Sequence, residues 1–231
     1  MSAPTTDKHR KESSLHRSLK FRYSGPGGAI EKTMGNYVCD GQTSKGEIIE
    51  VQTGSFGPLK EKVKHLNTKA KVRIIHPIAK QKQIELYSAG GKLLRSRKSP
   101  VKGSCFDIFK VLIYAPELPL LKNLTIELAV IDVVEKRIDD GSGSWRRKGV
   151  RIADRFLGAL HQSVVLKSLK DYRQFIPFGK NESFTVKDLA QKAAIKYSLA
   201  QKTIYTLSKM GLIIKAGKQG RALVYKPCSG S

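Results

Sequence analysis

Residues 181–231 carry the pattern that most constrains the fold. Phe184 suits a short strand, and Thr185 followed three residues later by Asp188 is typical of a helix N-terminus. Apolar residues then recur at helical spacing in two successive segments, the second beginning near Ser198 and ending at Gly211. Residues 212–225 place two apolar runs around a glycine-rich tip, which predicts a β-hairpin.

A helix, a turn, a second helix and a hairpin in this order resemble a winged helix-turn-helix domain. In that fold the second helix enters the major groove of DNA, and the hairpin, or wing, approaches phosphates. The resemblance implies double-stranded DNA as a partner, contacted by Gln201, Lys202, Tyr205, Lys209, Lys215, Lys218 and Arg221. A winged helix used for protein contact is the alternative. DNA is favoured because no acidic residue follows Asp188.

The charge balance points to the same class of partner. The chain has 43 Lys and Arg against 19 Asp and Glu, a net charge of +24, while 40% of its 231 residues are apolar and can build a core. A folded protein this basic is expected to bind a polyanion, above all nucleic acid. A membrane surface is the weaker alternative.

Cysteine usage and apolar run lengths exclude other classes. Cys39, Cys105 and Cys228 stand far apart and are odd in number, which disfavours both a disulfide framework and a zinc site. The first residues lack the apolar segment of a secretory signal, and no run approaches the ~18 apolar residues of a membrane span. The expected location is the cytoplasm, in association with the nucleoid and away from membranes.

Two carboxylates are predicted to meet in the N-terminal half. Residues 37–39 and 47–53 are predicted as strands, and the polar residues 42–46 between them are predicted to turn. This hairpin would bring Asp40 beside Glu50. Paired carboxylates from adjacent strands repel unless a cation lies between them, and hard oxygen ligands suit Mg²⁺ or Mn²⁺.

These residues resemble the PD-(D/E)XK nuclease superfamily, whose sites carry an Asp on one strand and Glu-x-Lys on the next, often with a Glu on a preceding helix. Asp40 and Glu50 match the two metal ligands, and Glu31 matches the upstream Glu if residues 28–34 form a short helix. The resemblance covers roughly residues 15–135. It implies an α/β restriction-endonuclease-like core, in which a mixed sheet is flanked by helices, followed by the small α+β winged-helix domain.

Gln52 departs from the superfamily pattern, because it stands where the lysine is expected. A glutamine can orient a water molecule but carries no charge to support a developing anion. Lys45 and Lys60 are the two lysines expected to be able to replace that charge in space. The wider pattern, Glu50 to Gly57 followed by a basic helix and by Arg95 to Pro100, also resembles an uncharacterised bacterial family.

The remaining segments complete the prediction. A helix is expected at 59–67, a strand at 71–78 closed by Pro77, a buried helix at 104–114 and a strand at 124–134. A basic loop at 92–100 and the start of a basic linker are expected to hold phosphates through Arg95, Arg97, Lys98, Arg146 and Arg147.

The predicted organisation has four parts: a flexible basic arm (1–14), a nuclease-like domain (15–140), a basic linker with a long amphipathic helix over 152–175 (141–180), and the winged-helix domain (181–231).

The first functional hypothesis is a metal-dependent DNA endonuclease, with Asp40 and Glu50 holding the metal, Gln52 positioning water and Glu31 assisting. The alternative is a non-enzymatic DNA-binding regulator with an inactive nuclease-like domain. RNA processing is a third, weaker hypothesis. A homodimer is plausible because cutting two strands normally needs two sites.

Overall fold

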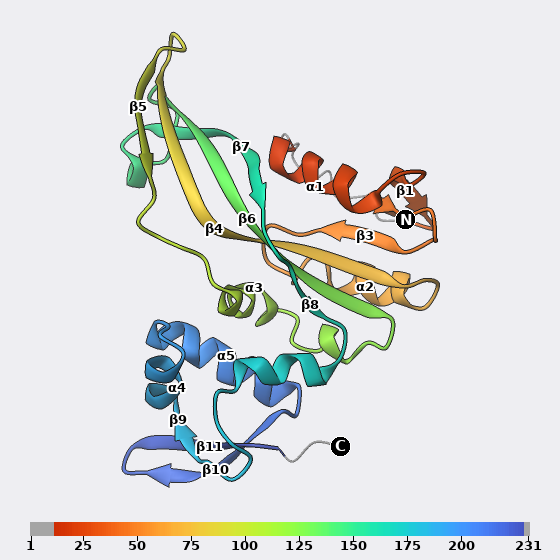
Figure 1. Ribbon diagram of the computed structural model, residues 1–231, viewed down its shortest axis with the longest axis vertical. Coiled ribbons are helices and arrows are strands. Elements are labelled where there is room, and N and C mark those ends of the chain that lie inside the picture. Colours follow the sequence, from red (N-terminus) through yellow and green to blue (C-terminus); the bar gives the residue numbers. More distant parts are fainter. Residues whose placement is uncertain (1–11, 229–231) are drawn as a thin grey trace, which may run out of the picture.

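The computed structural model describes residues 12–228, and residues 1–11 of the predicted N-terminal arm lie outside this range. A large mixed sheet with helices on its faces occupies most of the molecule, and a smaller helix-and-sheet unit made from the C-terminal residues packs at one end of the long axis (Figure 1).

The first half of the large sheet is built by a helix, three strands, a helix and a further strand. These are α1 (Ser14–Ser24), β1 (Ala29–Met34), β2 (Tyr37–Gln42), β3 (Ile48–Val51), α2 (Lys60–Asn67) and β4 (Val72–Ser88). The strands β1, β2 and β3 run antiparallel in sequence order, whereas β4 lies parallel to β3 after the crossover through α2. The predicted hairpin and the predicted helix at 59–67 are confirmed.

Two long parallel strands, β4 and β6 (Leu124–Asp139), form the centre of the sheet. Their first halves are near-continuous apolar runs, as expected of strands covered on both faces. Their second halves extend beyond the helices (Figure 1) and pair with β5 (Leu93–Lys98) and β7 (Val150–Leu160). The short β8 (Val164–Leu166) pairs with the start of β6.

Three local predictions in this region are wrong. Residues 29–34 form a strand rather than a helix, because they pair with β2 along its whole length. Pro77 does not close its strand, since β4 continues through Pro77 opposite Ala129. The predicted basic loop at 92–100 contains β5, which folds back on β4 after the turn at Gly90 and Gly91.

The long amphipathic helix predicted for 152–175 is also wrong. This stretch forms β7, β8 and a 3₁₀ segment, η4 (Leu169–Phe175), and Gly141–Ser144 lies in the connection between the paired strands β6 and β7. The helical spacing was ambiguous because positions four residues apart share one face of a strand as well as one face of a helix. The buried helix predicted at 104–114 is a 3₁₀ turn, η1 (Cys105–Ile108), followed by the short α3 (Phe109–Leu112).

The C-terminal unit has the predicted order of elements. It comprises β9 (Phe184–Thr185), α4 (Val186–Lys192), α5 (Tyr197–Lys209), β10 (Ile213–Gln219) and β11 (Ala222–Pro227), with β11 between β10 and β9. Thr185 and Asp188 form the reciprocal capping box predicted for α4. The second helix begins at Tyr197 with Lys196 as its N-cap, two residues before the predicted cap, Ser198.

Two apolar clusters cover the two faces of the large sheet. The smaller cluster lies under α1 and contains Leu15, Leu19, Ile49 and Val51. The larger cluster lies under α2 and α3 and continues into the C-terminal unit. Two further 3₁₀ turns, η2 (Leu118–Leu120) and η3 (Trp145–Arg147), lie in connections. Between residues 12 and 228, no helix is long and apolar enough to cross a membrane.

Candidate functional site

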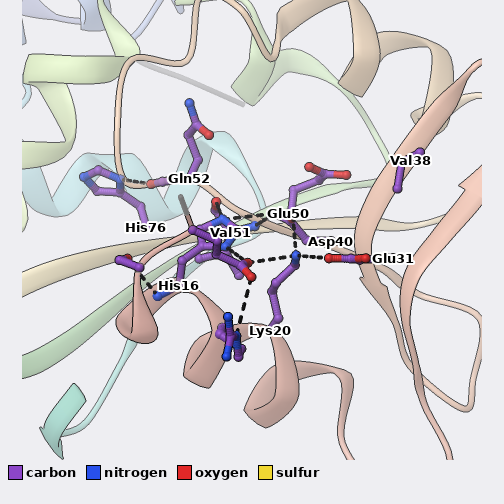
Figure 2. A network of polar contacts seen from close by, with 12 residues as sticks. His16, Lys20, Glu31, Val38, Asp40, Glu50, Val51, Gln52 and His76 are labelled. Carbon is purple, nitrogen blue, oxygen red and sulfur yellow. Dashed lines mark hydrogen bonds and ion pairs between the residues drawn. The ribbon is translucent and has the colours of Figure 1, made fainter. Parts of the chain in front are cut away.

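The predicted pair of carboxylates lies where β2 and β3 separate. Pairing between the strands runs through Gln42 opposite Ile48 and Gly41 opposite Ile49, and it stops there. Beyond this point a side chain replaces the main-chain pairing, because Asp40 Oδ2 accepts a hydrogen bond from the main-chain N–H of Val51 at 2.8 Å. The main chain of Asp40 lies close enough to the Glu50 carboxylate to lower the pKa of Glu50. The two acidic residues are therefore neighbours at the open end of the hairpin (Figure 2).

Glu50 faces α2 and is paired with a lysine that the sequence analysis did not identify. Its side chain belongs to the same face as Ile48, and only 3% of the residue is exposed. Lys62 Nζ, from α2, lies 2.7 Å from both carboxylate oxygens and also donates to the Val38 carbonyl at 2.7 Å. Burial raises the pKa of Glu50, and the charge of Lys62 offsets only part of that effect.

Neither lysine that was expected to replace the missing charge reaches Glu50. Lys60 forms an ion pair with Glu117, and Lys45 lies in the β2–β3 turn. Lys62 directly precedes the buried Val63, so its stem starts at the edge of the helix face that packs on the sheet. The position of Lys62 in the helical repeat is the signal that could have identified it.

Asp40 turns toward α1, where a row of residues four apart approaches it. Lys20 Nζ lies 3.5 Å from Asp40 Oδ1 and 2.9 Å from the Glu12 carboxylate. His16 Nε2 lies 3.4 Å from Asp40 Oδ2 and donates to the Val51 carbonyl at 2.8 Å. Asp40 therefore belongs to an ion-pair network in which His16 and Lys20 are shared with Glu12, and Lys20 also with Glu31.

His16 is an imidazolium on hydrogen-bonding grounds. Its Nδ1 faces the Glu12 carboxylate at 2.6 Å and its Nε2 faces a carbonyl oxygen, and both partners can only accept. Burial alone would lower the pKa of His16, but the hydrogen bond and charge of Asp40, with the contribution of Glu12, raise it to about 9. Burial would raise the pKa of Asp40, yet His16, the Val51 N–H and Lys20 lower it.

Glu31 and Gln52 do not take the positions predicted for them. Glu31 lies on β1 with a left-handed φ of 54°, its side chain is 65% exposed, and it reaches the site only through Lys20 at 3.2 Å. The acidic residue next to the preceding helix is Glu12 instead. The Gln52 side chain extends away from Asp40 (Figure 2). Its amide N–H donates to the Ser55 carbonyl at 2.5 Å, and the main-chain carbonyl of Gln52 accepts from His76 Nδ1 at 2.6 Å.

The donor set suits a hard divalent cation but is small. Within residues 12–228, no group of three or more His, Cys, Asp and Glu side chains is placed to hold a metal. Asp40 and Glu50 offer carboxylate oxygens from adjacent strands, and Mg²⁺ is commonly held by one or two carboxylates with waters and phosphates completing its shell. The side chains of Asp40 and Glu50 turn toward α1 and α2 on opposite faces of the sheet, and metal binding by their carboxylates stays a prediction.

The DNA-contact residues predicted on the C-terminal unit are exposed, apart from the half-buried Lys202. Gln201, Tyr205 and Lys209 are four residues apart on α5 and exposed, with Lys202 half-buried beside them. Residues 214–223 of the β10–β11 hairpin are all exposed and carry Lys215, Lys218 and Arg221. A groove of about 460 Å³ lies between this helix face and the hairpin, lined among others by Gln201, Tyr205 and Arg221.

The other predicted phosphate contacts fall into two groups. Arg95 and Arg97 on β5 lie opposite Leu86 and Ile84 of β4, on the sheet face over which Arg146 and Arg147 fold. Lys98 is paired with Gln83 and therefore belongs to the other face. The structure brings four of the five residues together and separates Lys98 from them.

The architecture defines a mixed α/β protein with a polar site at the open end of a hairpin and a small basic C-terminal unit. Residues 13–167 match the family model described as "Domain of unknown function (DUF8091)", and the chain belongs to this family. Over 219 residues it is 29% identical to an uncharacterised protein of Treponema pallidum (strain Nichols). This match covers 94% of this chain and 85% of that protein. No solved structure matches the chain.

Proposed function

We propose that this protein is a metal-dependent phosphodiester hydrolase that acts on DNA held by its C-terminal unit. The order of a helix, three antiparallel strands, a helix and a parallel strand supports the resemblance to the PD-(D/E)XK nuclease core. The order of α4, α5 and the β10–β11 hairpin supports the resemblance to a winged helix-turn-helix domain.

The observation that carries the proposal is the grouping of Asp40, Glu50 and Lys62 at the point where β2 and β3 separate. Asp40 and Glu50 would hold Mg²⁺ or Mn²⁺, which, when bound, lowers the pKa of a water and neutralises phosphate charge. Lys62 places a positive charge beside Glu50, where it can stabilise the anion that develops on the phosphate. It takes the role expected of a lysine at position 52.

DNA would be held by the exposed face of α5 and by the wing. Gln201 and Lys202 have the side chains that can bond to base edges in the major groove, and Lys215, Lys218 and Arg221 can neutralise phosphates. In residues 189–228, the sequence offers no carboxylate that would repel the backbone.

A non-enzymatic DNA-binding protein is the second candidate, and His16 favours it. The imidazolium lies between Asp40 Oδ2 and the Val51 carbonyl oxygen, two oxygens that a metal ion could otherwise use. Lys62 and Lys20 already neutralise the carboxylates of Glu50 and Asp40. In this alternative the ion pairs are structural and the nuclease-like fold is inactive.

Cleavage of supercoiled plasmid in Mg²⁺ or Mn²⁺ separates the two candidates. We expect the wild type to nick DNA, and Asp40→Asn and Lys62→Gln to lose nicking while they still retard a DNA fragment in a gel. Lys64→Gln is the matched control, because Lys64 lies on the same helix but pairs with Glu61 and Glu117, and it should keep full activity. If the wild type binds DNA and no metal produces nicking, the second candidate is correct.

A further inference from the structure

A pocket rich in arginine lies at the end of the long axis opposite the C-terminal unit (Figure 1). It is formed where the extended parts of β4, β5 and β6 meet the turn that carries η3, and its volume is about 570 Å³. Strand register explains how the cations gather: Arg95 lies opposite Leu86, and Leu86 lies opposite Arg137 of β6. The cationic lining consists of Arg95, Arg97, Arg137, Arg146, Arg147 and Lys148.

No carboxylate lines this pocket. On β6, Glu135 and the exposed Asp139 each lie two residues from Arg137 outside the lining, and the buried Glu135 is already held by Arg137 at 2.6 Å and Arg155 at 3.0 Å. Arg95, Arg97 and Arg146 form no ion pair with any residue of the described range 12–228. Several unpaired guanidinium groups in one concave site favour a ligand with more than one phosphate.

The pocket also offers apolar surface that a phosphate alone would not use. Its floor is made by Ile84, Leu86 and Val150. Next to it, Trp145 is 83% exposed, with the Arg146 guanidinium 5.6 Å from the ring centre. An aromatic platform beside a cationic groove is the arrangement on which unpaired bases stack, because every base has a π face.

We infer that the arginine pocket binds single-stranded nucleic acid, with the guanidinium groups on successive phosphates and a base stacked on Trp145. A duplex would satisfy only half of this surface, since its bases are already stacked and its exterior offers phosphates alone. The pocket shares no residue with the carboxylate site or with α5. The inference can therefore be tested whether or not the proposed function holds.

Trp145 is the only tryptophan of the chain, so tryptophan fluorescence, excited selectively over the eight tyrosines, reports on this site. We expect oligothymidylate to quench it, and inorganic tripolyphosphate or a duplex of equal length to quench it far less. Arg95→Ala/Arg97→Ala/Arg146→Ala should weaken binding at least tenfold and lower the slope of log K against log salt by about 2, because each phosphate contact on a single strand contributes about 0.7.

Two further variants make the test specific. Trp145→Ala, followed by anisotropy of a labelled oligomer, should weaken binding about fivefold or more through lost stacking. Lys45→Ala/Lys71→Ala/Lys122→Ala is the matched control, because it removes three cations lining a separate cavity at the other end of β4 and β6, and it should leave affinity within about twofold.

Three results would overturn the inference: no quenching by oligothymidylate, equal quenching by tripolyphosphate or duplex, or a control triple variant as weak as the arginine variant. Failure of the winged-helix proposal gives a different result, in which Lys215→Ala/Lys218→Ala/Arg221→Ala leaves duplex retention unchanged. Quenching at Trp145 is then unaffected and the inference stands.

Discussion

At the residue scale, His16 couples stability to pH. Its pKa of about 9 in the folded protein exceeds the value of about 6.5 expected in the unfolded chain, so the folded state binds the proton more tightly. The resulting stabilisation is complete below about pH 6.5 and is lost as pH rises through about 9, and it amounts to about 3 kcal/mol at most. Urea unfolding of the wild type should show this loss between neutral and alkaline pH.

The variant His16→Gln tests whether the loss of stability at alkaline pH comes from His16. It should be less stable than the wild type at pH 6 and should lack the alkaline loss, because glutamine does not titrate. A wild-type unfolding free energy that stays constant from neutral pH to pH 9.5 would show that His16 is not an imidazolium in the fold.

The Glu50–Lys62 pair gives a second residue-scale prediction. Lys62→Met leaves a carboxylate buried without its cation, which should lower the free energy of unfolding by about 3–5 kcal/mol. Adding Glu50→Gln should recover most of this loss, because the remaining amide carries no charge. Lys64→Met, which removes an exposed pair, should cost below about 1 kcal/mol. Chemical denaturation measures the free energy of unfolding of the three variants. A double variant no more stable than Lys62→Met would show that Lys62 does not compensate a buried charge on Glu50.

Sequence reasoning found the acidic half of the site but not its cations. Asp40 and Glu50 are joined by a short hairpin, so alternation and turn chemistry were enough to predict that they are neighbours. His16, Lys20 and Lys62 reach the site only because α1 and α2 pack on opposite faces of the sheet. The helical repeat places Lys62 beside the apolar face of α2, but the placement of each helix against the sheet decides which lysine reaches a carboxylate.

At the element scale, the errors come from segments whose conformation is set by pairing. Ile152, Phe156 and Leu160 fit a helix and a strand equally well, and pairing with β6 selects the strand. The capped helices α4 and α5, by contrast, carry their own start and stop signals and were predicted to within one or two residues. Elements with caps and turns are therefore predictable here, as are the apolar first halves of β4 and β6, whereas segments whose apolar spacing fits both a helix and a strand are not.

The connection between β6 and β7 provides an element-scale prediction. Gly143 packs directly on the strand backbone, and a Cβ added there would lie 2.1 Å from the carbonyl of Val150. Gly143→Ala should force this connection open, destabilise the protein by about 1–3 kcal/mol and displace the neighbouring Trp145. Ser144→Ala, which adds no bulk, should leave the melting temperature unchanged. Thermal unfolding measures the difference, and a fully stable Gly143→Ala protein would contradict the tight packing.

At the scale of the whole molecule, the C-terminal unit is joined to the sheet by a continuous core. Phe175 contacts Phe109 at 5.0 Å between ring centroids, and Phe178 stacks on Phe184 at 4.1 Å. The same apolar cluster contains Val63 of α2 and Leu207 of α5. A ligand held on α5 is thus attached to the hairpin site through packed side chains rather than through a free linker.

The basic surfaces at the two ends of the molecule should act independently. Lys218→Ala/Arg221→Ala removes two wing cations, and because each phosphate contact on B-DNA contributes about 0.9, the slope of log K against log salt for a duplex should fall by about 2. The arginine pocket lies at the other end of the long axis (Figure 1), so its triple variant should leave this slope unchanged. Duplex binding measured over a range of salt tests both statements. An unchanged slope for the wing variant would exclude the wing as a phosphate contact, and an equal fall for both variants would mean that one duplex spans the whole molecule.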